Sequence, residues 1–334
     1  MTSPAFVKRA RILGTGHYLP ERVLSNVDLE KMVDTSDEWI SSRTGIRERH
    51  VAAEGEATSD MAIAAAKNAL EMAGVSAKEL DMIIVATISP DMQMPATAMF
   101  VQRAIGARSD CPGFDVAAAC AGFLYNMSIA DAFIRTGQAK RILIIGAEMI
   151  TRYVDWNDRN TCVLFGDGAG AAVLGPSEDG ERGILSTHIY ADGGQAESLW
   201  IPGGGTKNPM SHEIIDSKQH RVKMVGKDVF KFAVKAMSAA AETALTANGM
   251  TVKDVDWMIP HQANLRIIEG VTQRTGMPQE RVIVNIANTA NTSSASVAIA
   301  LDQAVRQGKI KPNQIVLFAA LGGGIAWGSA LVRW

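Results

Sequence analysis

The stretch Phe114-Asp-Val-Ala-Ala-Ala-Cys120-Ala-Gly-Phe-Leu-Tyr125 places a cysteine between a run of small apolar residues and the start of a helical pattern. The run from Phe114 to Ala119 is typical of a buried strand, and the apolar residues after Gly122 recur at helical spacing. We therefore predict Cys120 at a strand-to-helix junction, where free backbone N–H groups and the positive end of the helix dipole favour a thiolate. The alternative interpretation is a small buried residue, which most free cysteines are.

The composition is that of an ordinary soluble globular protein. Of 334 residues, 47% are hydrophobic and 20% are charged, which is enough for one large core or two. A net charge of −2 offers no basic surface for nucleic acid. The cysteines Cys111, Cys120 and Cys162 are odd in number and form no CxxC pair. We predict neither a disulfide framework nor a metal site, and we interpret Cys111 and Cys162 as structural.

Two segments bear on the location of the protein. Met1 to Pro20 lacks the apolar core of a signal peptide. Ile315 to Val332 is uncharged and about long enough to span a bilayer. Gly322-Gly-Gly324 and Gly328 interrupt that run, so we predict two buried strands around a glycine loop. We expect a cytoplasmic protein with no membrane span.

An internal repeat organises the chain into two halves. Gly74-Val-Ser-Ala-Lys-Glu-Leu-Asp-Met-Ile-Ile84 aligns without a gap on Gly249-Met-Thr-Val-Lys-Asp-Val-Asp-Trp-Met-Ile259, at an offset of 175 residues. The alanine-rich helices predicted before the two segments match at the same offset. We predict a duplicated mixed α/β fold, with residues 1–175 carrying the cysteine and residues 183–334 forming the second half.

Two further segments have a distinctive composition. Val163 to Leu174, which contains Gly166-Asp-Gly-Ala-Gly170, is predicted to continue the first sheet as a strand. Gly193 to Lys227 is a polar insertion, rich in glycine and proline, with no clear period. Long irregular loops in compact domains are usually functional or mobile, so we interpret the insertion as a mobile lid.

The duplication predicts that each half delivers reactive groups to one centre, because sites in open α/β sheets collect beyond the carboxyl ends of strands. The predicted strand Val255 to Pro260 ends in His261-Gln-Ala-Asn264. The segment equivalent to the Cys120 junction is rich in Asn, Thr and Ser and includes Asn291. One half therefore offers a thiol and the other an imidazole and an amide. The alternatives are a structural or exposed histidine and a turn or cap built from Asn, Thr and Ser.

The ordered set of motifs resembles the β-ketoacyl-[acyl carrier protein] synthase III enzymes of the thiolase-fold superfamily, over essentially the whole chain. The motifs are Asp37-Glu-Trp39-Ile, Arg43-Thr-Gly-Ile46, Ala118-Ala-Cys120-Ala-Gly-Phe123, Phe165-Gly-Asp-Gly-Ala-Gly170, Pro260-His-Gln-Ala-Asn264, Asn291-Thr-Ser-Ser-Ala-Ser296 and Gly322-Gly-Gly-Ile-Ala-Trp327. The resemblance implies a five-layered αβαβα thiolase fold and a homodimer.

The resemblance also implies a reaction, a decarboxylative Claisen condensation that starts fatty acid synthesis. The Cys120 thiolate attacks an acyl-CoA and forms an acyl-enzyme thioester, with the amides of Cys120 and Gly323 as oxyanion donors. Malonyl-acyl carrier protein then loses CO2, and His261 and Asn291 donate hydrogen bonds to the enolate oxygen. The carbanion attacks the acyl group to give β-ketoacyl-acyl carrier protein. The resemblance implies no metal and no cofactor. Coenzyme A takes part only as the thioester substrate.

Four positions are expected to bind coenzyme A by resemblance. Trp39 is expected to stack on the adenine, with Arg159 on the other side of that ring. Arg43 is expected to pair with a CoA phosphate, and Asn264 to lie at the tunnel wall near the pantetheine. The alternative for Trp39 is a core residue.

Two more positions concern the partners. Arg266 is expected to dock the acidic carrier protein, with Arg43 and the insertion's Lys223 and Lys227 extending a basic patch. Met94 lies where some members carry an aromatic residue that bounds the acyl pocket across the dimer. A methionine side chain is flexible, so the enzyme could accept primers that are longer or more branched than acetyl.

Rival functions differ in the residues they require. A biosynthetic thiolase needs a second cysteine in the C-terminal glycine motif, which Gly322-Gly-Gly324 lacks. A hydroxymethylglutaryl-CoA synthase needs a glutamate before the cysteine, and none lies between Glu79 and Glu148. The duplicated halves do not fit a papain-like hydrolase. A quinolone, alkene or polyketide starter synthase remains an alternative with a different acceptor, and a non-enzymatic interaction protein remains one of another class.

Overall fold

The repeat in the sequence is a repeat in space. The computed structural model describes residues 9–334. Each unit is a helix, a left-handed glycine, a 3₁₀ turn and a buried strand: α3 (Thr58–Ala73), Gly74, Ala77–Glu79 and β4 (Met82–Ala86) in the first, and α7 (Gly226–Ala247), Gly249, Val252–Asp254 and β11 (Trp257–Pro260) in the second. Both glycines have φ near +60°, a conformation that a residue without Cβ adopts freely.

Two mixed sheets contain the buried strands. The first has the order β1-β7-β6-β4-β5, with bounds Ala10–Tyr18, Gly168–Pro176, Ile142–Glu148, Met82–Ala86 and Gly113–Val116. The second has the order β8-β13-β12-β11, with bounds Gly183–Ala191, Ala326–Arg333, Ile315–Gly322 and Trp257–Pro260. In both, the first three strands are antiparallel and the next pairs in parallel. The predicted pair of strands around a glycine loop is confirmed as β12 and β13.

The fifth strand of the first sheet has a reduced counterpart in the second. Strand β5 runs parallel to β4, and Val282 forms a parallel bridge with Met258 of β11 at the equivalent place. Beyond β5 the chain reaches Cys120, and beyond Val282 it reaches Asn291. The two segments that the sequence analysis equated therefore leave their sheets at matching positions.

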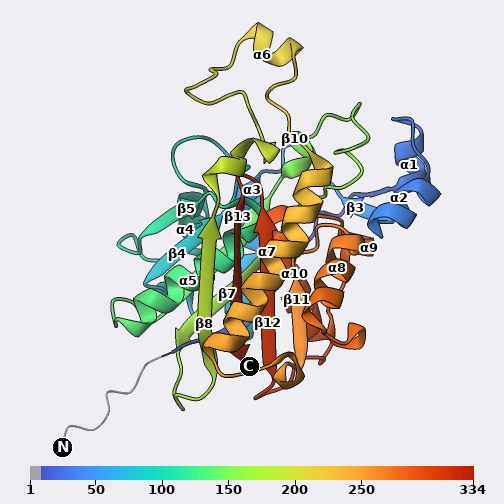
Figure 1. Ribbon diagram of the computed structural model, residues 1–334. Coiled ribbons are helices and arrows are strands. Elements are labelled where there is room, and N and C mark those ends of the chain that lie inside the picture. The colour runs from blue at the N-terminus through green and yellow to red at the C-terminus, as the bar shows by residue number, and fades with distance from the viewer. Residues whose placement is uncertain (1–8) are drawn as a thin grey trace, which may run out of the picture.

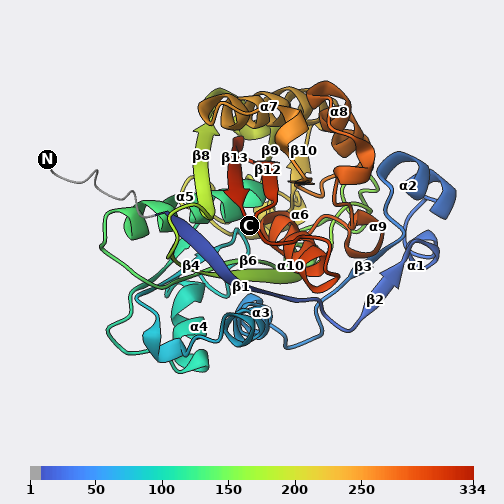
Figure 2. The same cartoon turned by 90° about the horizontal axis from the view of Figure 1, so that it is seen from below.

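Helices pack in three layers around the two sheets (Figures 1 and 2). Helices α3 and α4 (Thr97–Ile105) cover the outer face of the first sheet, and α7 and α8 (Leu265–Thr275) cover the outer face of the second. Helices α5 (Gly122–Arg135) and α10 (Ser296–Arg306) lie between the sheets and contact both. This order confirms the five-layered αβαβα thiolase fold.

The alanine face of α3 decides how closely that helix packs on its sheet. A Cβ added to Gly14 of β1 would lie 2.4 Å from the backbone N of Ala73, and one added to Gly16 would lie 2.3 Å from the carbonyl O of Ala65. Glycine on the strand and alanine on the helix thus let the two backbones meet in a close-packed interior.

Smaller elements cover one end of the sheets. Strands β2 (Val23–Ser25) and β3 (Glu48–His50) pair with each other, and the short helices are α1 (Asn26–Glu30), α2 (Asp37–Thr44) and α9 (Ile286–Thr289). Ser36 caps the start of α2, since its hydroxyl accepts a hydrogen bond of 3.1 Å from the Trp39 N–H. Trp39 is thereby fixed on the first turn of a capped helix.

The insertion Gly193 to Lys227 is more regular than predicted. It contains β9 (Leu199–Trp200), which pairs with β10 (Lys223–Met224), and α6 (His212–Asp216) at the tip of a projecting loop (Figure 1). The sequence shows no period here because the paired strands have only two residues each, too few for an alternation to register.

No helix within residues 9–334 combines the length and hydropathy needed to cross a membrane.

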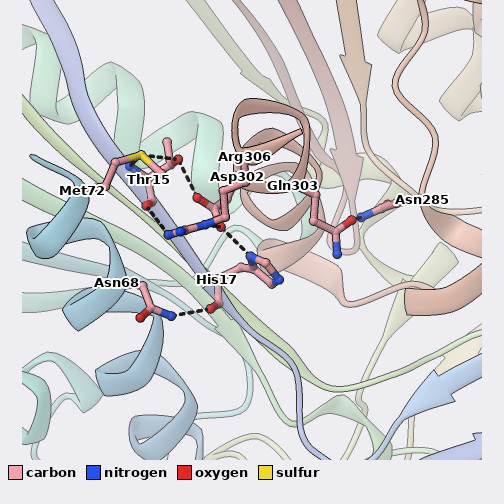
Figure 3. Close-up of polar contacts among 8 residues, drawn as sticks. All are labelled: Thr15, His17, Asn68, Met72, Asn285, Asp302, Gln303 and Arg306. Atoms are coloured by element: carbon pink, nitrogen blue, oxygen red, sulfur yellow. Dashed lines mark hydrogen bonds and ion pairs between the residues drawn. The ribbon is translucent and has the colours of Figure 1, made fainter. Parts of the chain in front are cut away.

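A polar cluster joins the two halves through β1 and α10 (Figure 3). The buried carboxylate of Asp302 accepts hydrogen bonds from Thr15 Oγ1 at 2.7 Å and Arg306 Nε at 2.8 Å, and contacts His17 Nδ1 at 2.5 Å. Burial opposes the charged form, but the bonds from His17, Thr15 and Arg306 outweigh it and lower the pKa of Asp302.

We expect Asp302→Asn to lower the free energy of unfolding at pH 7 by about 1–3 kcal/mol, because a buried charged acceptor is lost. A lowered folded pKa stabilises the protein above the unfolded value, and that contribution disappears as pH falls through the folded pKa. The difference between wild type and variant in urea unfolding should therefore shrink below about pH 4. Asp110→Asn, at an exposed pair with Arg108, is the control without a measurable loss. A difference that stays constant with pH would contradict this account.

Candidate active site

Cys120, His261 and Asn291 line one cavity of about 850 Å³. They come from the two halves, and all three side chains are nearly covered, with exposed fractions of 5%, 1% and 6%. The three residue types that the sequence analysis singled out therefore meet at a single buried centre.

Cys120 lies on a 3₁₀ turn, Ala119–Ala121, between β5 and α5. The predicted strand ends earlier than expected, at Val116, and Ala119 has a φ of +44°, a left-handed conformation that is strained for alanine. A Cβ on Gly322 would lie 2.4 Å from the Cys120 backbone N. The glycine loop between β12 and β13 thus packs directly on the backbone of the cysteine.

The expectation of a stabilised thiolate at Cys120 is wrong for the chain alone. Burial, with a smaller contribution from nearby Glu148, raises the pKa of the thiol to about 12. The nearby Ser293 hydroxyl and the backbone amides of Cys120 and Gly323 lower the pKa but do not offset burial. The sequence placed the cysteine correctly at the helix start, but it could not show how completely the second half covers it.

His261 follows β11 and is held at both ends. Its backbone N–H donates to the carbonyl of Ala319 at 2.8 Å, and its ring Nδ1 lies 2.5 Å from Ser296 Oγ, at the start of α10. Burial lowers the pKa of His261 to about 3, so the imidazole is neutral at physiological pH.

Asn291 is positioned by backbone pairing with the segment before β7. Its N–H donates to Leu164 O at 2.9 Å, and its carbonyl accepts from the Gly166 N–H at 3.1 Å. The strand predicted from Val163 therefore begins only at Gly168, because residues 164–166 bind Asn291 instead. The Ser293 N–H donates to Asn291 Oδ1 at 2.9 Å, which leaves the NH2 end of the amide for a group in the cavity.

A second cavity of about 330 Å³ also borders Cys120. Gly323 and Ser293 line it together with apolar residues, namely Ile88, Ile150, Phe165, Leu199, Trp200, Ile201 and Val222. Four of these belong to the insertion Gly193 to Lys227, so that segment builds the wall of this cavity. The apolar triplet Leu199-Trp-Ile201 was the signal for it in an otherwise polar stretch.

The mouth of the larger cavity gathers aromatic and cationic groups. Trp39 and Arg43 line it, and the Arg43 guanidinium lies over the Trp39 ring, 4.8 Å from its centroid. Arg159 lies 5.3 Å from the same centroid without lining the cavity. Asn264 caps α8 by accepting from the Arg266 N–H at 2.9 Å, and both residues line the cavity.

Met94 lies apart from these residues. It is 84% exposed and lines neither of the two cavities that border Cys120. The structure therefore brings together the residues that the sequence analysis placed at the site except Met94 and Lys223, neither of which lines the two cavities at Cys120.

Sequence reasoning missed Glu148, which lies behind Cys120 at the end of β6. Its side chain is fully buried and accepts a hydrogen bond from Ser293 Oγ at 3.1 Å. The signal was a glutamate closing an otherwise apolar strand, Ile142 to Ala147. Across residues 9–334, no group of three His, Cys, Asp or Glu side chains is placed to hold a metal ion.

Comparison with known proteins places these motifs in one family. Residues 114–193 match the model of 3-oxoacyl-[acyl-carrier-protein] synthase III, and residues 245–334 match the model of its C-terminal part. The chain is 53% identical over 327 residues to the β-ketoacyl-[acyl-carrier-protein] synthase III of Xanthomonas campestris, covering 97% of this chain and 98% of that one. It is 51% identical over 325 residues to the same-named protein of Caldanaerobacter subterraneus, with the same coverage.

Solved structures agree. The 3-oxoacyl-[acyl-carrier-protein] synthase III of Aquifex aeolicus superposes with a TM-score of 0.91 at 46% identity, covering 97% of this chain and all of that one. The priming β-ketosynthase of the R1128 polyketide pathway superposes with a TM-score of 0.90 at 37% identity, covering 100% and 99%. On the strength of its fold, its site and these likenesses, the chain belongs to the β-ketoacyl-[acyl-carrier-protein] synthase III family of condensing enzymes.

Proposed function

We propose that the chain starts fatty acid synthesis by condensing an acyl-CoA primer with malonyl-acyl carrier protein through an acyl thioester on Cys120. One observation carries the proposal. The buried thiol of Cys120 lines two cavities: a larger one that it shares with the neutral imidazole of His261, the amide of Asn291 and several cationic side chains, and a smaller, mainly apolar one. The relatives at about half identity all bear the name of this enzyme.

In the first half-reaction, the Cys120 sulfur attacks the thioester carbonyl and CoA leaves. The backbone N–H groups of Cys120 and Gly323 lower the pKa of the thiol, and we assign them as the donors to the developing oxyanion. The acyl chain then enters the apolar cavity beyond Cys120. The tight contact of Gly322 with the Cys120 backbone keeps these two amides together.

In the second half-reaction, CO2 departs from the malonyl group and leaves its electron pair as an enolate. Ser296 Oγ accepts from the Gln262 N–H at 3.4 Å, so its own hydrogen is available to His261 Nδ1. That arrangement puts the imidazole proton on Nε2, where it can be donated to the enolate oxygen together with the Asn291 NH2. The electron pair of the broken bond to CO2 stays on the malonyl carbon as the enolate, so the step requires neither a metal nor a cofactor.

Coenzyme A is proposed to enter through the larger cavity. Its adenine would stack on Trp39, with Arg159 on the opposite face. An adenine ring stacked between Trp39 and Arg159 requires those two side chains to be about 7 Å apart, which is twice the usual contact distance. The Arg159 guanidinium now lies 5.3 Å from the Trp39 ring centroid, so it must move away when the adenine binds. Arg43 would bind a phosphate, and Asn264 would contact the pantetheine arm.

The carrier protein is proposed to dock at the same mouth. Arg266, Arg43, Lys227 and Lys231 all line the cavity and are exposed, against one acidic neighbour, Asp158. A local cationic surface on a chain of net charge −2 would steer an acidic partner to the opening.

A homodimer is proposed at the edge of the first sheet. Strand β5 ends that sheet, and it is only half-buried in the described chain. Met92, Met94 and Met99 are exposed beside it, before and within α4. Unpaired edge strands with exposed apolar neighbours are typical association surfaces. Met94 would then reach the partner's acyl pocket, and the 330 Å³ cavity would admit primers longer or more branched than acetyl.

We place the reaction in the cytoplasm, because the mechanism needs Cys120 as a free thiol and a reducing compartment maintains one.

Active-site variants should separate the two half-reactions. We expect Cys120→Ala to abolish acylation from a panel of acyl-CoAs while retaining CO2 release from malonyl-carrier protein. His261→Ala and Asn291→Ala should still be acylated but release CO2 about 10²–10³-fold more slowly, the usual loss when an oxyanion donor is removed. Intact mass and labelled CO2 report the two steps. Acylation of Cys120→Ala by any primer would contradict the assignment.

Docking can be separated from catalysis on one helix. We expect Arg266→Ala to raise the KM for malonyl-carrier protein about 5–10-fold, more at low salt, and to leave acylation by acyl-CoA unchanged. Arg274→Ala, an exposed arginine at the far end of α8, is the matched control. Equal effects of both variants on this KM would show that α8 attracts the carrier protein only through its overall charge. That result would contradict a specific docking contact at Arg266.

A further inference from the structure

A chain of buried polar atoms leads away from the thiol of Cys120. Sγ donates to Ser293 Oγ at 3.5 Å, and Ser293 Oγ donates to Glu148 Oε1 at 3.1 Å. The three residues are 5%, 2% and 0% exposed. Among residues 9–334 this is the hydrogen bond that the thiol makes, and none joins it to His261.

Glu148 is held in one orientation by the first sheet. Its Oε2 accepts from Ser89 Oγ at 2.6 Å, from the Ile88 N–H at 3.1 Å and from Thr87 Oγ1 at 3.2 Å. Ser89 Oγ itself accepts from the Met149 N–H at 2.9 Å, so its hydrogen is committed to Glu148. The donors on Oε2 leave Oε1, the atom that faces Ser293, as the accessible proton acceptor.

The surroundings make Glu148 a carboxylate that readily takes a proton. Burial raises its pKa, opposed by hydrogen bonds from Ser89, Ile88, Ser294 and Ser293. Glu148 takes part in none of the ion pairs found among residues 9–334. Buried carboxylates normally have such a partner, and one without it gains by neutralisation.

The cysteine needs an acceptor of this kind. Burial raises the pKa of its thiol to about 12, so the thiol is protonated when acyl-CoA arrives. The imidazole of His261 is a poor base, because burial lowers its pKa to about 3 and Ser296 occupies its Nδ1.

We propose that Glu148, acting through Ser293 Oγ, stores the proton of Cys120 while the cysteine carries the acyl group. Glu148 lines neither of the two cavities at Cys120, so it is a positioning residue that acts through Ser293. The inference rests on the proposed acyl-Cys120 intermediate.

The protons and electrons balance over the two half-reactions. On acylation the S–H bond breaks, its proton passes to Ser293 Oγ, and the Ser293 proton passes to Glu148 Oε1. The sulfur forms its bond to the acyl carbon and the CoA thiolate leaves, to be protonated in solvent. On condensation the carbanion displaces Cys120 as a thiolate, and the stored proton returns by the same two steps.

The backbone of Ser293 is held in a strained conformation that positions its neighbours. Its φ is +50°, a left-handed conformation that is strained for serine, and its N–H orients Asn291. Ser293 therefore connects the cysteine of one half to the amide of the other, and Ser293→Ala removes the hydroxyl without removing the backbone bond to Asn291.

The test compares single-turnover acylation of Cys120, followed by intact mass, with CO2 release from malonyl-carrier protein in the absence of acyl-CoA. The variants are Glu148→Gln, Ser293→Ala and their combination, assayed with acetyl-CoA and octanoyl-CoA between pH 6 and 9. Tyr153 also faces Glu148, but burial and Glu148 raise the pKa of its hydroxyl, so it stays protonated in this range. Asp167→Asn is the matched control, because Asp167 is equally buried and bonds Ala52 and Thr151 instead.

We expect Glu148→Gln to slow acylation about 10–100-fold at pH 7, at unchanged half-saturating acyl-CoA and unchanged CO2 release. Ser293→Ala should show the same loss, and the double variant no more than either. The deficit should shrink as pH rises, because hydroxide then removes the thiol proton. Asp167→Asn should keep the wild-type ratio of the two rates.

Two results would overturn the proposal. Acylation of Glu148→Gln and Ser293→Ala at the wild-type rate would show that the proton leaves by another path. A parallel fall of acylation and CO2 release at every pH would show that Glu148 only holds the site in shape. Absence of acylation in the wild type would instead remove the proposed acyl-enzyme itself, so the two failures are distinguishable.

Discussion

The close approach of two strand-to-helix junctions, one from each half, is the constraint on which the rest of the structure depends. Helices α5 and α10 share the layer between the sheets, and the turns that start them lie against each other. A Cβ on Gly146 of β6 would lie 2.2 Å from Ser294 O, so the turn before α10 approaches the first sheet this closely only because β6 carries a glycine there. The duplication thus becomes one active site, since Cys120 precedes α5 and Asn291 precedes α10.

That contact also explains the electrostatics of the site. It excludes water from Cys120, His261 and Glu148 together, and burial then disfavours the charged form of each. A neutral imidazole is suited to donating a hydrogen bond to an enolate, whereas a protonated thiol is not yet suited to attack. Exclusion of water therefore favours the second half-reaction, because it keeps the imidazole neutral. It also keeps the thiol protonated, so the first half-reaction needs a proton acceptor.

Much of this arrangement was predictable from the sequence, because it follows from local patterns. The alanine-rich helices expected before Gly74 and Gly249 are α3 and α7, and the repeat anticipated the duplicated arrangement of the two sheets. The role of Glu148 and the raised pKa of Cys120 were not predictable, since both depend on which residues of one half cover the other. The prediction that a strand starts at Val163 was wrong for the same reason, because long-range pairing of this segment with Asn291 replaced the local preference for a strand. The division at residues 1–175 and 183–334 stays a prediction.

The central claim is that the acyl group passes through Cys120 on its way to product. It can be tested by isolating the acyl-enzyme free of acyl-CoA, mixing it with malonyl-carrier protein and quenching at successive times. Our account predicts that the mass adduct on the Cys120 peptide disappears at the same rate at which CO2 and β-ketoacyl-carrier protein form, one for one. A persistent adduct while product accumulates from added acyl-CoA would contradict it.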